Sequence, residues 1–202
     1  MELYCEKPAL KNYLQETEVI DYSHRLIQKT IAALALDELD EVGKIKQAFL
    51  FVRDEISHSW DIQSHKVTCA ASDVLREKEG ICYAKSHLLA ALLRAQGVPT
   101  GFCYQRLMLF DTLEKGYALH GLNAVYSQTL QRWIRLDPRG NKPGVDAQFS
   151  ITTEQLAFKP DEKVGEKDGH TIYVNPLPVI VDTLTKHKDA LHMYVYHQPD
   201  AF

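Results

Sequence analysis

The sequence lacks several features that would assign the protein to a class at once. Its 202 residues carry a formal net charge of −4, so no basic excess is available to attract nucleic acid or an anionic membrane. No run approaches the roughly 20 apolar residues of a membrane span. The N-terminal residues 1–7 also lack the basic and apolar segments of a secretory signal. We therefore expect a cytoplasmic protein that binds neither nucleic acid nor membrane.

Cysteine is scarce, and no two cysteines form a Cys-x-x-Cys pair. In a reducing compartment we expect the thiols to be free, because nothing there favours disulfide formation. At least one thiol is then available for chemistry. The four cysteines are Cys5, Cys69, Cys82 and Cys103.

The distribution of apolar residues indicates a single domain over residues 1–202, since 45% hydrophobic content is ordinary for a packed core. We divide it into an N-terminal helical part at about 1–58, a core at about 59–141 and a C-terminal extension at about 142–202. Helical spacing predicts a helix around 26–34, capped by Asp21 or Ser23, and a second from about Glu38. A polar loop or short strand is predicted from Ser57 to Thr68.

The middle of the chain alternates between helix and strand signals. A short helix is predicted over 70–78 with Ser72 as its cap, followed by a largely apolar helix that begins at Cys82 and ends before Gly97. Strands are predicted at 100–110, 119–126 and 132–136 from their β-branched and aromatic content. A further short helix is predicted near 153–158, and the apolar run 178–184 is predicted to join the core.

Cys82 occupies the first turn of the predicted apolar helix. Unpaired backbone N–H groups and the helix dipole at this end stabilise a thiolate and the oxyanion of a tetrahedral intermediate. Gly80, just before it, is predicted to allow a sharp turn and to leave space for a substrate carbonyl. A buried cysteine is also a common small core residue, so its position alone does not decide the role.

His120 and Asp137 are predicted to face each other on two neighbouring strands. If Tyr126 pairs with Gln131 across a four-residue loop, the same register places Asp137 directly opposite His120. A carboxylate there would hold one imidazole nitrogen and leave the other for a thiol. A slip of one residue would put the two side chains on opposite faces of the sheet. Alternatively, His120 is a core histidine and Asp137 the first residue of a turn.

The segment from Gly80 to Pro99, with its Gly-Ile-Cys start and its Leu-Leu-Arg-Ala-Gln-Gly-Val-Pro close, resembles the nucleophile helix of bacterial transglutaminase-like proteins. The surroundings of His120 and Asp137 are similar to the histidine and aspartate segments of that family. The resemblance spans roughly residues 48–141 and implies an α+β, papain-like fold in which N-terminal helices and the nucleophile helix pack on a central antiparallel sheet. Arg139 departs from the usual Asp-Pro-Thr, and Gly121 and Leu122 follow the histidine where many relatives carry a tryptophan.

The resemblance implies a cysteine acyl-transfer enzyme with a catalytic triad of Cys82, His120 and Asp137, acting on an amide or peptide bond of a peptide or protein. We expect a thioester intermediate, with protease or amidase activity favoured over protein cross-linking, and no cofactor or metal. The second oxyanion donor is predicted to come from Trp60 or Gln63.

Two other functions remain open from the sequence. A protein of the same fold that has lost catalysis would bind a peptide or partner protein without turnover. A zinc site is the other alternative, although the spacings match no compact zinc pattern. Its candidate ligands are His58, His65, Cys69, Cys82 and His87.

Overall fold

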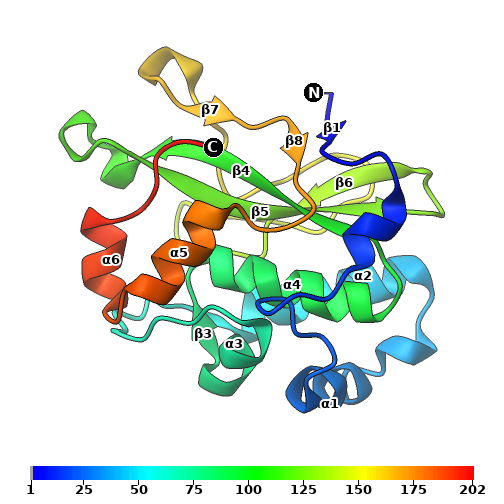
Figure 1. The fold of residues 1–202 in the computed structure, drawn as a ribbon. Coiled ribbons are helices and arrows are strands. Elements are labelled where there is room, and N and C mark those ends of the chain that lie inside the picture. Colours follow the sequence, from blue (N-terminus) through cyan, green and yellow to red (C-terminus); the bar gives the residue numbers. More distant parts are fainter. Residues whose placement is uncertain (1) are drawn as a thin grey trace.

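A computed structural model describes residues 2–202 and shows a helical layer packed against an antiparallel sheet (Figure 1). Short 3-10 helices lie at 10–14, 36–38, 109–111, 113–115 and 162–164. The α-helices of the described residues are α1 (Arg25–Ala33), α2 (Glu41–Glu55), α3 (Ala71–Glu77), α4 (Cys82–Ala95), α5 (Pro178–Lys186) and α6 (Ala190–Tyr196).

The central sheet has the strand order β6-β5-β4-β7, and every neighbouring pair is antiparallel. Helices and an antiparallel sheet in separate layers form the α+β architecture that was predicted. The strands of this sheet are β4 (Thr100–Met108), β5 (Tyr117–Ser127), β6 (Arg132–Leu136) and β7 (Lys167–Asp168). Two short parallel pairs accompany it, namely β1 (Tyr4–Cys5) with β8 (Thr171–Ile172), and β2 (Ser57–His58) with β3 (Glu79–Gly80).

Helix α4 forms the centre of the molecule. Every residue from Cys82 to Arg94 is buried, and the helix packs against α2, α3 and β5. Its alanine and leucine side chains cover almost the whole circumference, which explains why the helix has no solvated face. The predicted start at Cys82 is confirmed, and the helix ends before Gly97, whose φ of 73° lies in the left-handed region. Truncating a leucine here is expected to cost about 2–5 kcal/mol.

The N-terminal caps differ from those predicted. The cap of α1 is His24, whose Nδ1 accepts from a backbone N–H at 3.2 Å, and neither Asp21 nor Ser23 has this role. Asp21 instead accepts from the backbone N–H of Ser72 at 3.0 Å and so joins the segment before α1 to the first turn of α3. Ser72 is therefore inside α3 and does not cap it. Local sequence cannot reveal a cap that comes from another element.

Two outer segments also differ from the prediction. Helix α2 begins at Glu41 and not near Glu38, because the Asp40 carboxylate caps it by accepting a backbone N–H at 2.7 Å. Residues 153–158 form no helix. Gln155 lies opposite Gln148 in an isolated antiparallel bridge that ties this segment to the preceding loop.

The register of the β5–β6 hairpin is shifted by two residues from the predicted one. Tyr126 pairs with Trp133 rather than with Gln131, which lies in the loop with a left-handed φ of 52°. Asp137 therefore follows β6 and lies diagonally across from His120 instead of directly opposite. Because the shift is even, both side chains remain on the same face of the sheet.

A carboxylate from α2 explains the shifted hairpin. The side chain of Glu41 accepts hydrogen bonds from the Ser127 hydroxyl at 2.6 Å and from the backbone N–H groups of Gln128 and Thr129, both at 3.0 Å. These bonds pair the loop's donors and favour a turn that begins one residue later than predicted. The contact joins residues 86 to 88 positions apart, so it is invisible in a local pattern.

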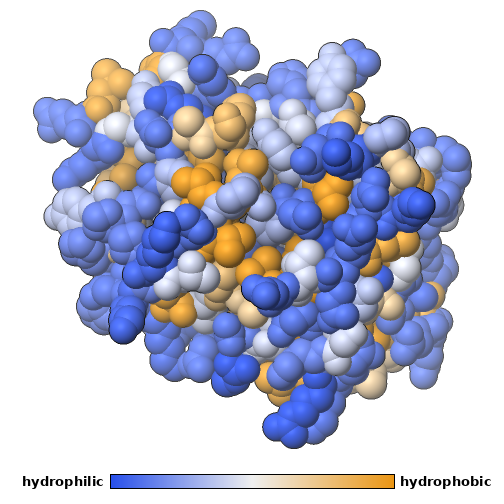
Figure 2. Space-filling model, in the orientation of Figure 1, coloured by the Kyte–Doolittle hydropathy of each residue, from blue (hydrophilic) through white to orange (hydrophobic). Residues whose placement is uncertain are grey.

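The C-terminal helices α5 and α6 lie beside the N-terminal end of α4 and below the sheet in the view of Figure 1. On the face shown in Figure 2, hydrophilic residues predominate, and hydrophobic ones form smaller patches between them. Within residues 2–202, no helix combines the length and apolar character that crossing a membrane requires.

Candidate active site

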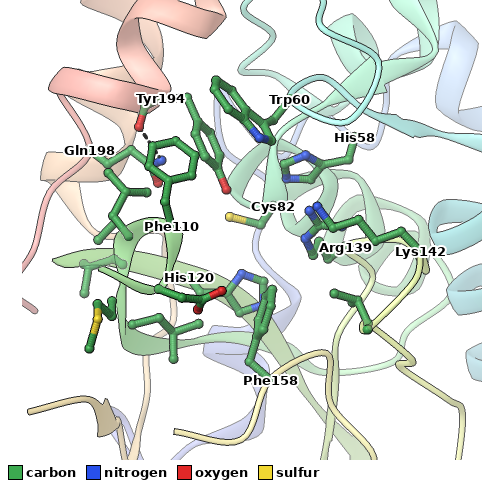
Figure 3. Close-up of a pocket in the computed structure, with 18 of the residues that line it drawn as sticks. His58, Trp60, Cys82, Phe110, His120, Arg139, Lys142, Phe158, Tyr194 and Gln198 are labelled. Atoms are coloured by element: carbon green, nitrogen blue, oxygen red, sulfur yellow. Dashed lines mark hydrogen bonds between the residues drawn. The ribbon is translucent and has the colours of Figure 1, made fainter. Parts of the chain in front are cut away.

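A cavity of about 470 Å³ opens where the helical layer meets the sheet. Its walls come from segments far apart in the sequence, with β2 and α4 on one side, β5 on the other, and α6 beside them (Figure 3). Several lining residues carry ionisable or aromatic side chains, namely His58, Trp60, Cys82, Phe110, His120, Arg139, Lys142, Phe158 and Tyr194.

Cys82 is the first residue of α4, and its sulfur faces the cavity (Figure 3). Ile81 precedes it in an extended conformation and makes no side-chain cap, so the first backbone N–H groups of α4 do not donate to that side chain. These N–H groups and the positive end of the dipole favour an anionic sulfur. The residue is only 4% exposed, so its side chain is largely shielded from bulk water.

Gly80 has a different role from the predicted one. An added Cβ would lie 2.9 Å from the Thr68 hydroxyl and 3.0 Å from the Ala84 methyl group, so the space beside Gly80 is already filled by protein. Its φ is not in the left-handed region. The glycine therefore allows close packing of β3 on α4 and makes no room for a substrate carbonyl.

His120 and Asp137 form a buried contact, with His120 Nε2 2.7 Å from Asp137 Oδ2. The other ring nitrogen, Nδ1, is then free to face Cys82, and the imidazole lies below the sulfur in Figure 3. Burial disfavours the imidazolium, but the negative charges of Asp137 and of a Cys82 thiolate outweigh it and raise the pKa of His120 to about 10. The histidine is thus held protonated beside the sulfur.

Asp137 is fixed by two backbone donors in addition to the imidazole. Its Oδ1 accepts from the Arg139 N–H at 3.2 Å, and its Oδ2 accepts from the Ala157 N–H at 3.1 Å. Burial would raise the pKa of the carboxyl group, but the His120 imidazolium and these hydrogen bonds lower it below 3.8. The carboxylate therefore stays ionised and keeps the imidazole in one orientation. Ala157 belongs to the C-terminal part, which thus supports the site directly.

The two predicted oxyanion candidates differ in their placement. Trp60 lines the cavity and stacks on Tyr194, with ring centroids 4.6 Å apart and planes 14° apart. Gln63 is exposed and does not line the cavity; its amide donates to the Trp60 carbonyl at 2.6 Å. Phe110 contacts both rings, at centroid distances of 5.2 Å from Trp60 and 6.1 Å from Tyr194. The part of the cavity wall that Trp60, Phe110 and Tyr194 form is consequently aromatic.

His58, Arg139 and Tyr194 are among the cavity residues to which sequence reasoning gave no catalytic role. Arg139 is 3% exposed and forms a bidentate ion pair with Asp61 at 2.8 and 2.9 Å. The only sequence signal for it was the departure from Asp-Pro-Thr at position 139. His58 lies in the segment that was predicted to be a polar loop or short strand, and the sequence suggested it only as a zinc ligand. Nothing in the sequence pattern indicated that Tyr194 would line this cavity.

The zinc alternative gains no support from the arrangement of its residues. His65 instead pairs with Asp189 at 2.9 Å, and His87 contacts the Cys69 carbonyl through its Nδ1 at 2.8 Å. Across residues 2–202, no three histidine, cysteine, aspartate or glutamate side chains gather in a way that could hold a metal ion.

Comparison with known families assigns the chain. The model of the transglutaminase-like superfamily matches residues 28–138, which is more than half of the sequence and includes Cys82, His120 and Asp137. The chain belongs to the transglutaminase-like superfamily. The fold class and the family resemblance drawn from the Cys82 helix are thereby confirmed.

The superfamily member is also similar to two solved structures. One is named "Putative Cysteine Protease" from Cytophaga hutchinsonii, with 16% identity over 66% of this chain and a TM-score of 0.49. The other is a TGase, with 16% identity over 73% of this chain and a TM-score of 0.46. The chain spans only 43% and 42% of the length of these two structures. No curated protein matches it.

Proposed function

We propose that this superfamily member is a cysteine-dependent acyl-transfer enzyme that acts on amide or peptide bonds through a thioester. Cys82 is the nucleophile, His120 the general acid and base, and Asp137 the residue that orients the imidazole. One observation carries the proposal: an imidazole held by a carboxylate at 2.7 Å presents its free nitrogen towards a sulfur at a helix start. A core histidine with a structural role would not need a thiol at its second nitrogen.

The reaction follows from the charges of these groups. The Cys82 thiolate attacks the carbonyl carbon, a C–S bond forms, and the carbonyl electron pair moves onto oxygen. The backbone N–H at the start of α4 donates to that oxyanion. When the intermediate collapses, the C–N bond breaks and the imidazolium of His120 gives its proton to the leaving amine. Neutral His120 then takes a proton from the attacking water, a C–O bond forms, and the C–S bond breaks so that Cys82 leaves as a thiolate beside the His120 imidazolium.

We propose water rather than a lysine amine as the usual acceptor of the acyl group. The guanidinium of Arg139 lies close enough to Cys82 for their charges to interact, and Lys142 lines the same side of the cavity. Both cations pair with Asp61, which leaves one net positive charge on this side of the cavity; that charge opposes an approaching lysine ammonium ion but not water. Amide or peptide hydrolysis is therefore the favoured activity, and cross-linking is the second candidate because the superfamily includes it.

Selective alkylation tests the proposal against a non-catalytic binding protein. Cys5 is exposed and would react with any alkylating agent, so the experiment uses a Cys5→Ser background. Burial raises the pKa of Cys69 to about 11 and that of Cys103 to about 12, which keeps both protonated and slow near neutral pH. We expect iodoacetamide to modify Cys82 first at pH 7, as mapped by peptide mass spectrometry. Equal inertness of the three remaining thiols would contradict the proposal.

A matched variant identifies the cause of the reactivity. His120→Gln keeps a polar side chain of similar length but removes the imidazolium. We expect the alkylation rate of Cys82 at pH 7 to fall by about tenfold or more, because the thiolate loses its positive partner. An unchanged rate would mean that His120 does not activate the sulfur.

A further inference from the structure

The proposed reaction leaves one requirement unassigned. An oxyanion in an acyl-transfer site is generally held by two donors, and the start of α4 supplies one backbone N–H. The second donor must lie beside Cys82, carry an N–H or O–H that the protein does not already use, and face the cavity. His58 lines the cavity and meets these conditions.

The parallel pair of β2 and β3 fixes the position of His58. His58 lies directly across from Gly80, and the N–H of Ser59 donates to the Gly80 carbonyl at 3.2 Å. Gly80, in β3, is only two residues before Cys82. The pairing of β2 with β3 therefore places His58 close to the start of α4. In Figure 3 the imidazole lies next to the sulfur on the wall opposite His120. Both histidines line the same cavity.

His58 is buried and has an unused hydrogen-bonding group. The residue is 4% exposed, and its Nδ1 has no partner within the protein. Tyr194 packs edge-on against the ring at a centroid distance of 6.0 Å, which holds the ring plane in place. Buried N–H groups without a partner are rarer than buried acceptors without one, which favours the tautomer with its hydrogen on Nε2.

The charges around His58 keep it neutral. Burial and the nearby cations Arg139, Lys85 and His120 lower its pKa well below 6.5, and the opposing effect of Asp61 is smaller. A neutral imidazole carries one N–H and retains it, whereas an imidazolium could transfer its proton to the oxyanion. His58 and His120 therefore have opposite protonation states on opposite walls of one cavity.

We infer that the Nε2–H of His58 is the second oxyanion donor, acting together with the backbone N–H at Cys82. This inference rests on the proposed acyl-transfer function. His58 donates a hydrogen bond when the C–S bond forms and the carbonyl electron pair moves to oxygen, and it loses no proton at any step. The proton for the leaving group comes from His120. Trp60, stacked flat on Tyr194, then shapes the cavity wall and need not donate.

Two reactions of the same sulfur separate this role from a structural one. Acylation by p-nitrophenyl acetate passes through an oxyanion, whereas alkylation by iodoacetamide does not. The variants are His58→Gln, which keeps a donor, and His58→Met, which has a similar shape and no donor. The readout is the ratio of the acylation rate to the alkylation rate at Cys82 in the Cys5→Ser background, which corrects for any loss of folded protein.

We expect the ratio to fall about 100-fold in His58→Met and by less than about tenfold in His58→Gln. Trp60→Phe retains the stacked ring without the indole N–H and is expected to leave the ratio unchanged. Equal ratios in His58→Met and the parent would overturn the inference, and so would a 100-fold loss in Trp60→Phe alone. If the parent protein itself is not acylated at Cys82, the proposed function fails, and that result is distinct from a failure of His58.

Discussion

The two walls of the cavity differ in how their polar groups are hydrogen-bonded. We call the side with His120 and Asp137 the sheet wall, and the side with Cys82 and His58 the helical wall. On the sheet wall, His120 and Asp137 are hydrogen-bonded to each other, and backbone N–H groups complete the carboxylate's contacts. On the helical wall, the Nδ1 atom of His58 has no hydrogen-bonding partner in the protein, and the sulfur of Cys82 faces the cavity. The polar groups of the sheet wall are thus paired within the protein, whereas the helical wall carries an unpaired imidazole nitrogen.

This difference separates two tasks. Groups that move or hold protons benefit from fixed geometry and strong coupling, which strand pairing and buried ion pairs provide. Groups that meet the reacting carbonyl must stay unpaired until it binds, and a helix start and a short parallel strand pair provide such donors. The following experiments perturb one wall at a time, in order of decreasing expected effect.

Removing the nucleophile from the helical wall is expected to have the largest effect. Cys82→Ala should reduce the rate of p-nitrophenyl acetate hydrolysis by about 10⁴-fold or more, because no covalent intermediate can form. Since alanine fits the space of the small sulfur-bearing side chain, the melting temperature should change little. Residual activity close to the parent value would show that the sheet wall acts without the sulfur.

Neutralising the sheet wall is expected to be nearly as severe. Asp137→Asn should lower kcat/KM for the same ester by about 10³- to 10⁴-fold, because the amide cannot stabilise the imidazolium or fix its tautomer. Asp182→Asn is the matched control, since Asp182 is an exposed residue of α5 paired with Lys186. Equal effects of the two substitutions would contradict the orienting role of Asp137.

The protonation states of the two walls can be compared directly by NMR of the imidazole nitrogens. His120 should keep its proton up to about pH 10, while His58 should remain neutral at pH 6. In Asp137→Asn the His120 titration should move to lower pH, because the charge that raises its pKa is removed. Titration of both rings near pH 6.5 would contradict the proposed difference in protonation between His120 and His58.

The same shift links His120 to stability. Its pKa is higher in the folded state than the 6.5 of an unfolded chain, so its stabilising contribution is complete below pH 6.5 and is lost as the pH rises through about 10. Urea unfolding of the parent and of His120→Gln should therefore differ most below pH 6.5. The difference should shrink at pH 10.

The contribution of a buried lysine near the site to stability should have the opposite dependence on pH. Lys85 is fully buried, and its ammonium donates to the carbonyls of Arg53 and Ile56. Burial, followed by the charge of Arg139, lowers its pKa from 10.5 to about 7. Its destabilising contribution is therefore complete below pH 7 and is relieved as the pH rises towards 10.5.

Lys85→Met tests that sign. The free energy of unfolding of the variant should exceed that of the parent by the largest amount below pH 7. This difference should decline by about 3–5 kcal/mol between pH 7 and pH 10.5. Urea unfolding at several pH values measures it. A difference independent of pH would show that Lys85 keeps its ordinary pKa.

The sequence predicted the parts of the fold that depend on local pattern. The apolar circumference and the glycine stop of α4 define both of its ends, and the same segment carries the family resemblance. The β5–β6 register was wrong by two residues because Glu41, 86 residues away, sets the loop. His120 and Asp137 are nevertheless in contact, because a register shift of two residues keeps both side chains on the same face of the sheet.

The rest of the cavity depends on contacts that no local pattern encodes. His58 reaches the site through a two-residue parallel strand pair, and Tyr194 reaches it from a helix more than 100 residues after Cys82. Asp137 is held partly by Ala157, in a segment that was predicted to be helical and is not. Such contacts are set by tertiary packing, so they become visible only in three dimensions.

The most direct test is to trap the acyl-enzyme. The Cys5→Ser protein is mixed with p-nitrophenyl acetate, quenched with acid at early times and mapped by peptide mass spectrometry. We predict an acetyl group on Cys82 that forms and then hydrolyses in the parent, and that forms at a strongly reduced rate in His120→Gln. Acetylation spread evenly over Cys69, Cys82 and Cys103, or equal rates in the two proteins, would contradict activation of this sulfur by the buried histidine and aspartate.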